Sequence, residues 1–121
     1  MSDIQRQDRP DQLSVLSEVV DGVLVVTVHG EIDYTVSSIL SEALLTEDGA
    51  TPPRIVTDLS GVTFMDSSGI NVFLLAHQRV SSAQGWLRIA AAQKSVLRVL
   101  TMVGVDRLID CHASVEQALK A

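Results

Sequence analysis

The chain has 121 residues and a formal net charge of −6 at pH 7, from nine Lys and Arg against fifteen Asp and Glu. Hydrophobic residues make up 46% of it, which is enough for one buried core and argues against disorder of the whole chain. The acidic balance disfavours binding to phosphate backbones, and an aromatic share of 3% argues against a base-stacking surface. We therefore expect one globular domain that does not bind nucleic acid directly.

The amino-terminal stretch is polar and lacks the apolar core of a signal peptide. We predict that residues 1–12 are a flexible tail and that residues 13–121 form the domain. The longest uninterrupted apolar runs, such as residues 23–26, are far too short to span a bilayer. Cys111 is the one cysteine, so no internal disulfide can form, which fits a reducing compartment. The expectation is a soluble cytoplasmic protein with no membrane association.

The first ordered elements are predicted to be a β-hairpin followed by a helix. Residues 13–20 and 23–29 are β-rich runs, and Asp21-Gly22 between them is a strong two-residue turn signal. Apolar residues recur with helical spacing over residues 36–44, which indicates one buried helical face. Two polar residues are candidates for the N-cap of this helix: Asp33 and Thr35.

The rest of the chain is predicted to alternate between strands and helices. After a loop over residues 46–53 we expect a short buried strand over 55–59, which Ser60-Gly61 ends, and then a helix from Asp66 or Ser67 to about 84. A strand over 86–90 should follow, and then a helix that Ser95 caps and Gly104 stops. The last elements are predicted to be a strand over 108–111 and a helix that begins with a capping box of Ser114 and Gln117. Strands that alternate with helices imply a largely parallel sheet with helical cover.

These elements predict an α/β domain of mixed α+β type. Its mixed sheet has an antiparallel hairpin at the amino terminus, and the remaining strands alternate with about four helices packed largely on one face. We expect the domain to be a monomer.

One segment stands out chemically, where a strand-derived loop leads into a helix at Phe64-Met65-Asp66-Ser67-Ser68-Gly69. The first amides of a helix lack intrahelical partners, and the helix dipole adds partial positive charge there. A phosphate on Ser67 would therefore meet a favourable site, with Asp66 as N-cap and Gly69 leaving the first turn sterically open. Asp and Ser are also ordinary N-cap residues, so the tetrapeptide alone indicates only a helix start.

Three stretches resemble the STAS family, the small domains that include bacterial anti-sigma factor antagonists. Gly30-Glu31-Ile32-Asp33 matches the family's motif after its second strand. Residues 55–62 followed by 64–69 match its third strand and phosphorylation loop. Residues 96–105 resemble its late helix and turn. The likeness covers roughly residues 13–120, and the middle block is the most specific.

By that resemblance the phosphoacceptor is Ser67, the serine directly after the aspartate, and not its neighbour Ser68. Asp33 would lie near the same loop and help to shape a partner surface. Where the family often has a second glycine, this chain has Asn71, which would tune the choice of partner. The resemblance thus implies a partner-binding surface formed by Asp33, Asp66, Ser68, Gly69 and Asn71.

The resemblance also implies a partner-switching mechanism without enzymatic activity or a cofactor in this chain. The unphosphorylated protein would bind an anti-sigma factor that is itself a serine kinase, and so free a sigma factor. Phosphorylation of Ser67 would end that binding, and a PP2C-type phosphatase would restore it. ATP and Mg²⁺ would belong to the kinase. The acidic balance suggests a basic or mixed surface on the partner.

Other classes of protein fit the sequence less well. Ser67 lacks the G-x-S-x-G elbow of a serine hydrolase, and His29, His77 and His112 are scattered without ligand spacing for a metal. A receiver domain would use Asp58 at a strand end, but the acidic pair and the late lysine that its Mg²⁺ chemistry needs are missing. A STAS domain that serves a transporter, or a STAS subunit of a stress-sensing or lipid-transport complex, stays open as an alternative.

Overall fold

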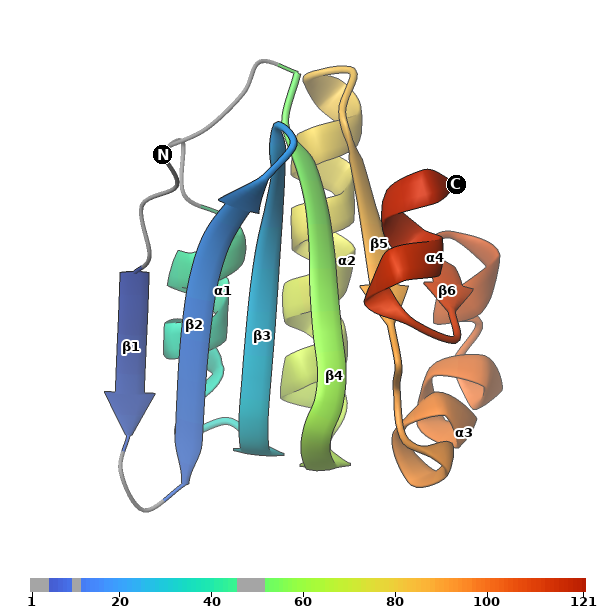
Figure 1. The fold of residues 1–121 in the computed structure, drawn as a ribbon. Coiled ribbons are helices and arrows are strands. Elements are labelled where there is room, and N and C mark those ends of the chain that lie inside the picture. Colours follow the sequence, from blue (N-terminus) through green and yellow to red (C-terminus); the bar gives the residue numbers. More distant parts are fainter. Residues whose placement is uncertain (1–4, 10–11, 46–51) are drawn as a thin grey trace.

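The structure is a computed structural model that describes residues 5–9, 12–45 and 52–121. Its elements are β1 (Gln5–Arg9), β2 (Leu13–Val20), β3 (Val23–Ile32), α1 (Ser37–Leu44), β4 (Arg54–Met65), α2 (Ser67–Ser82), β5 (Trp86–Ala90), α3 (Lys94–Met102), the 3₁₀ helix η1 (Val105–Arg107), β6 (Asp110–His112) and α4 (Val115–Lys120). Within these ranges the strands form one six-stranded sheet whose spatial order follows the sequence (Figure 1).

The sheet is mixed, as the sequence predicts. β2 pairs antiparallel with both β1 and β3, whereas β3, β4, β5 and β6 pair in parallel. Asp21 and Gly22 form the predicted tight turn, and both have positive φ angles of 51° and 79°. Such angles at both turn residues match the right-handed twist of the flanking strands. The predicted hairpin and the largely parallel remainder of the sheet are therefore confirmed.

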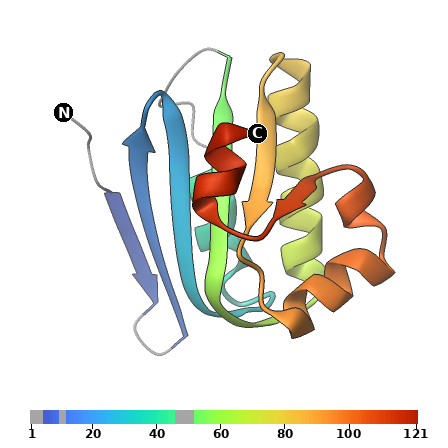
Figure 2. The same cartoon turned by 45° about the vertical axis from the view of Figure 1, so that its right-hand side comes forward.

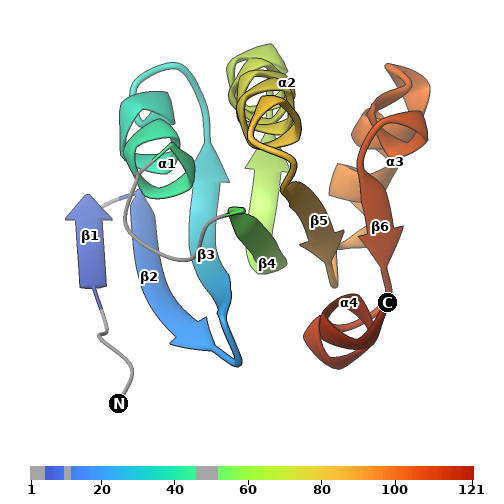
Figure 3. The same ribbon diagram turned by 90° about the horizontal axis from the view of Figure 1, so that it is seen from above.

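Helices cover the two faces of the sheet unequally. Viewed from above, α1 and α2 lie side by side on one face, while α4 lies on the other (Figure 3). Figure 2 shows α4 in front of the sheet, across from α2. Side chains of α3 join the same core as those of α1 and α2. Three of the four described α-helices therefore occupy one face, in line with the prediction.

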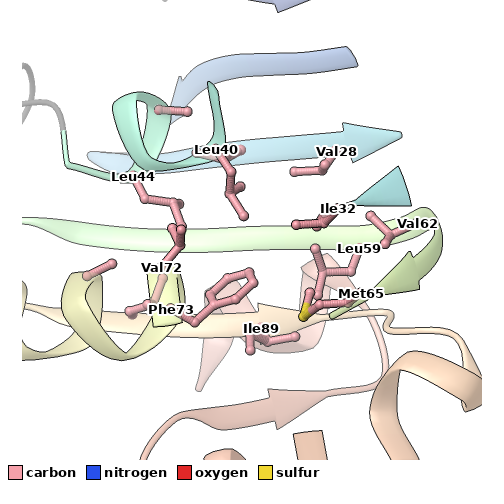
Figure 4. Packing of buried hydrophobic residues seen from close by; sticks show 14 of the residues in the cluster. Val28, Ile32, Leu40, Leu44, Leu59, Val62, Met65, Val72, Phe73 and Ile89 are labelled. Carbon is pink, nitrogen blue, oxygen red and sulfur yellow. The ribbon is translucent and has the colours of Figure 1, made fainter. Parts of the chain in front are cut away.

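The main core lies between the sheet and these three helices. Alternate residues of β3, such as Val26 and Val28, point into it because successive strand side chains face opposite sides of the sheet. Phe73 of α2 is the largest fully buried side chain, and it lies among Ile89 of β5 and Met65 of β4 (Figure 4). With so few aromatic residues, aliphatic side chains fill most of this core.

A smaller apolar cluster lies under α4 on the opposite face, built around Val23, Val56, Ala90 and Ala118. Arg88 holds the helix in place, because its Nη1 donates a hydrogen bond of 2.8 Å to the carbonyl oxygen of Ala118. The same guanidinium lies 3.6 Å from the ring centroid of Trp86, a cation–π contact. A terminal helix of six residues is thus anchored by both apolar burial and a hydrogen bond.

The sheet begins earlier than the sequence indicated. Residues 1–12 were predicted to be a flexible tail, yet residues 5–9 form β1 and pair with β2. This stretch is polar and carries no apolar alternation, so the sequence contains no strand signal there. The backbone groups at the open edge of β2 supply the pairing. Residues 1–4 and 10–11, and the predicted loop as far as residue 51, lie outside the described residues.

The strand predicted over residues 55–59 continues to Met65, so the expected break at Ser60-Gly61 is wrong. The pairing with β3 shifts register twice, after Thr27 and after Gly30, and at each shift β4 contains one more residue than β3. These bulges let the two strands stay paired beyond Ser60-Gly61. Asp58 therefore lies within β4 and not at a strand end.

Three other boundaries differ from the prediction. Val36 is the N-cap residue of α1, and its apolar side chain cannot make a capping bond. Asp33, one of the two predicted caps, instead accepts bonds from Gln12 and Thr35. α3 begins one residue before Ser95, with Gln93 as N-cap. The last strand spans residues 110–112 because Leu108 still belongs to the 3₁₀ turn, its amide donating to Val105.

Two predicted helix starts are confirmed. Asp66 is the N-cap of α2, and Ser114 caps α4 by accepting a bond of 3.1 Å from the amide of Gln117. In turn, Oε1 of the Gln117 side chain accepts a bond of 3.3 Å from the amide of Ala113. No helix in the described ranges is both long and apolar enough to cross a bilayer.

Thr57 offers a test of the core. It is fully buried in β4, and its hydroxyl has no hydrogen-bond partner among the described residues. An unsatisfied buried hydroxyl loses its hydration without compensation. We expect Thr57→Val, which keeps the shape, to raise the free energy of unfolding by about 1 kcal/mol. Urea titration of both proteins measures this, with Thr27→Val in the partly exposed part of β3 as the control. A destabilised Thr57→Val would contradict it.

Candidate functional site

Two segments that are distant in sequence meet at the carboxyl end of β3 and β4, at the lower edge of the sheet in Figure 1. Glu31 pairs with Phe64, and Ile32 pairs with Met65. Beyond the last pair, the amide of Asp66 donates a hydrogen bond of 3.1 Å to the carbonyl oxygen of Ile32. The turn after β3 and the start of α2 are therefore held next to each other by backbone pairing.

The start of α2 distinguishes its two serines. The carboxylate of Asp66 accepts a bond of 2.8 Å from the amide of Ser68 and a short bond from the hydroxyl of the same residue. The Ser68 hydroxyl is therefore tied to the cap and is partly buried. Ser67 is exposed, at the first position of the helix. Of the two adjacent hydroxyls, the structure leaves that of Ser67 accessible to a partner.

Gly69 lets this helix approach the sheet closely. A Cβ atom at this position would lie 2.8 Å from Cγ2 of Ile32 and 2.8 Å from Cγ of Met65. Both side chains belong to the main core, so neither has room to withdraw (Figure 4). The glycine thus fixes the depth at which the first turn of α2 rests on β3 and β4.

The carboxylate of Asp33 is the centre of a second hydrogen-bonded group. It accepts bonds of 2.6 Å from Nε2 of Gln12, of 2.9 Å from the amide of Thr35 and of 2.5 Å from the Thr35 hydroxyl. The Thr35 hydroxyl bond is the largest cause of a lowered pKa of Asp33, which partial desolvation opposes. The backbone oxygen of Gln12 also accepts from the amide of Glu31. The start of β2 is thereby tied to the turn that follows β3.

The other predicted site residues lie on the same end of the molecule. Asp33 and the loop from Asp66 to Gly69 are brought together by the pairing of β3 and β4. Asn71 is exposed, one helical turn beyond Ser67, so these two side chains share the outer face of α2. Asp33, Asp66, Ser68 and Asn71 therefore lie in neighbouring segments at this end, whereas Gly69, also predicted for the partner surface, is buried against Ile32 and Met65.

The residues that a receiver domain, a serine hydrolase or a metal site would need are not brought together in the described part of the chain. Oδ1 of Asp58 accepts from the amide of Ser60, 2.9 Å away, on the interior of a strand. His29, His77 and His112 belong to three different elements. Within the described ranges, no three His, Cys, Asp or Glu side chains are grouped as metal ligands would be. Burial and the charges of Asp106 and Asp110 raise the pKa of Cys111 to about 11.

Three residues at this end were assigned no role from the sequence: Gln12, Tyr34 and Phe64. Gln12 was assigned to the tail, and its role depends on a contact with Asp33 across 21 positions. The side chains of Tyr34 and Phe64 are 79% and 48% exposed. Large apolar side chains in or next to a strand are ordinarily expected to be buried. An exposed aromatic side chain is visible only once the faces of the strands are known.

The comparisons with known proteins agree with this fold. A model of the STAS domain family matches residues 14–118. The anti-sigma-F factor antagonist RsfB of Mycobacterium tuberculosis (strain H37Rv) is 26% identical over 110 residues, 91% of this chain and 89% of RsfB. The anti-sigma-B factor antagonist of Bacillus subtilis (strain 168) is 33% identical over 93 residues, 75% of this chain and 83% of that protein.

Solved structures give the same result. An anti-sigma factor antagonist from Mycobacterium paratuberculosis has a TM-score of 0.81 and 29% sequence identity to this chain. The match covers 94% of this chain and 97% of that structure. The likeness therefore extends over the whole domain and is not confined to the loop before α2.

The close approach at Gly69 can be tested by adding one methyl group. We expect Gly69→Ala to lower the free energy of unfolding by about 1–3 kcal/mol, because Ile32 and Met65 must move to admit the new Cβ. Chemical denaturation followed by circular dichroism measures the change. Asn71→Ala, at an exposed position of the same helix, is the control and should change stability little. Equal stability of the two variants would contradict the close approach.

The hydrogen bonds at Asp33 predict a pH dependence. Since the folded protein lowers the pKa of Asp33, the contribution of these bonds to stability is present above the ordinary value of 3.8 and is lost as the pH falls through the lower folded value. We expect Thr35→Val to raise the pKa of Asp33 towards the ordinary value, as measured by carboxyl carbon NMR. Thr63→Val, whose hydroxyl donates to Gly30, is the control. An unchanged pKa in Thr35→Val would contradict the assignment.

Proposed function

Because the chain belongs to the STAS domain family, we propose that it is an anti-sigma factor antagonist whose binding is switched off by phosphorylation of Ser67. In its unphosphorylated form it binds an anti-sigma factor and so releases a sigma factor. The family is non-enzymatic, and we assign the chain a hydroxyl and a docking surface but no catalytic residue. The anti-sigma factor is the serine kinase and supplies ATP and Mg²⁺, and a PP2C-type phosphatase removes the phosphate.

The observation that carries this proposal is the unequal state of two adjacent serines. Ser68 donates its hydroxyl to the N-cap carboxylate of Asp66, whereas Ser67 is exposed at the first position of α2. A kinase needs an accessible hydroxyl on a backbone that it can approach from solvent. That difference supports Ser67 as the phosphoacceptor, independently of the likeness to known antagonists.

The remaining site residues receive distinct roles in the proposal. Asp33 shapes the turn beside the phosphorylation loop through its bonds to Gln12 and Thr35. Asp66 and Gly69 set the position and depth of the first turn of α2. Asn71, on the exposed face one turn further on, contacts the partner and contributes to the choice among related kinases.

Electrostatics favours a switch that acts on binding and not on folding. A phosphoserine adds about −1.5 to −2 charges at neutral pH. At a helix N-terminus that charge is stabilising by roughly 0.3–1 kcal/mol, and the neighbouring carboxylate of Asp66 opposes it by a similar amount. Inside an interface without matching cations, the phosphate instead loses water at a cost of several kcal/mol. A loss of ~3 kcal/mol would weaken binding about a hundredfold.

The test uses the anti-sigma factors encoded in the same genome as this chain, each purified and titrated calorimetrically with the unphosphorylated protein. We expect at least one to bind the wild type and Ser67→Ala tightly, and to bind Ser67→Asp about a hundredfold more weakly. The melting temperatures of the two variants should stay close to that of the wild type, because Ser67 is exposed.

Incubation of the binding anti-sigma factor with ATP and this chain, followed by peptide mapping, should find phosphate on Ser67. Ser68→Ala is the matched control and should still be phosphorylated. Phosphate on Ser68, an acid-labile phosphate on Asp58, or equally tight binding by Ser67→Ala and Ser67→Asp would contradict the proposed switch.

A further inference from the structure

The aromatic residues of this chain are distributed unevenly between core and surface. There are four of them, one Trp, one Tyr and two Phe. Phe73 is fully buried, and Trp86 is covered in part by Arg88 and by the cluster under α4. Tyr34 and Phe64 are exposed at 79% and 48%. A core with so few aromatic residues nevertheless leaves two of them facing solvent.

Both exposed aromatic residues lie at the end of the sheet that carries Ser67. Phe64 is paired with Glu31 at the end of β4, three residues before Ser67. Tyr34 lies in the turn directly after β3, whose last residue is joined to Asp66 by a backbone hydrogen bond. Met65 points into the main core, so Phe64 faces the opposite side of the sheet. Both rings therefore belong to segments that border the phosphorylation loop, with Phe64 on the face of the sheet away from the main core.

The backbone under each ring is fixed. The carbonyl oxygen of Tyr34 accepts a bond of 3.2 Å from the hydroxyl of Ser37, and the amide of Val36 donates to Asp33 across the same turn. Phe64 lies within a paired strand. Anchoring side chains on an ordered backbone lose little conformational entropy on binding, which favours affinity.

Three carboxylates lie in the segments 31–36 and 62–69, which contain no Lys or Arg. That of Asp33 is engaged by Gln12 and Thr35, and that of Asp66 by Ser68. Glu31, which pairs with Phe64, is exposed. The region therefore offers a partner two aromatic rings and the hydroxyl of Ser67 in an acidic setting. Tyrosine and other aromatic residues are common among the side chains that dominate binding energy at interfaces.

We infer that Tyr34 and Phe64 are the apolar anchors by which the anti-sigma factor docks, end-on over the carboxyl edge of β3 and β4. This inference rests on the proposed function and assigns it a recognition chemistry. The partner presents an apolar pocket for each ring. A phosphate on Ser67 would then lose water beside apolar contacts and next to the carboxylate of Asp66, both of which oppose binding.

The experiment uses the anti-sigma factor that binds the unphosphorylated wild type, and compares variants of matched exposure. Tyr34→Ala and Phe64→Ala are expected to weaken binding by about tenfold or more each. Met102→Ala and Leu108→Ala, exposed at 79% and 57% and outside the segments 31–36 and 62–69, serve as controls and should change affinity less than about twofold. Tyr34→Phe should retain most of the affinity, because the ring is kept.

Thermal melting of each variant separates a loss of contact from a loss of fold. If Tyr34→Ala and Phe64→Ala bind within twofold of the wild type while Ser67→Asp binds weakly, the two rings are not anchors. The proposed function is then still supported. If no anti-sigma factor binds the wild type, or Ser67→Asp binds as well as the wild type, the proposed function itself fails and the anchors fail with it.

Discussion

The parallel pairing of β3 with β4 is the constraint on which the rest of the site depends. It continues past two irregularities of register to the last residues of both strands, where Ile32 meets Met65. One further backbone bond, from Asp66 to Ile32, carries the pairing into the cap of α2. Because the close approach at Gly69 rests on the same two core side chains, the depth of the helix follows from the strand register.

This arrangement separates stability from recognition within a few residues. The carboxylates of Asp33 and Asp66 accept hydrogen bonds from neighbouring residues and hold the turn and the helix cap, so they act mainly on local structure. The exposed side chains of this region include Glu31, Tyr34, Phe64, Ser67 and Asn71. An interface that uses the second set can be changed without disturbing the first set, because the two share only backbone.

The sequence predicted the parts of this site that are encoded locally. Asp21-Gly22 predicted the turn of the hairpin correctly. The start of α2 at Asp66 was predicted because apolar residues recur with helical spacing after Met65. Contacts between distant segments were not predictable in the same way. The bond between Gln12 and Asp33 spans 21 positions, and it removed Asp33 from the helix cap that local rules assigned to it. β4 was predicted too short because Ser60-Gly61 suggests a break unless it is known that β4 accommodates extra residues as bulges opposite β3.

The position of Ser67 also explains why a charge can act there without unfolding the domain. Its helix is held by Ile70, Phe73 and Ala76, which are buried at distances of one to three turns from the serine. The free energy that keeps α2 on the sheet therefore resides in contacts that a phosphate at the first position does not touch. What the phosphate changes is the hydration and charge of a surface already bounded by two aromatic rings. Under the proposed function, a phosphate that must keep its water could not occupy the centre of an apolar contact, and modification of one exposed hydroxyl would then be enough to weaken binding of a partner.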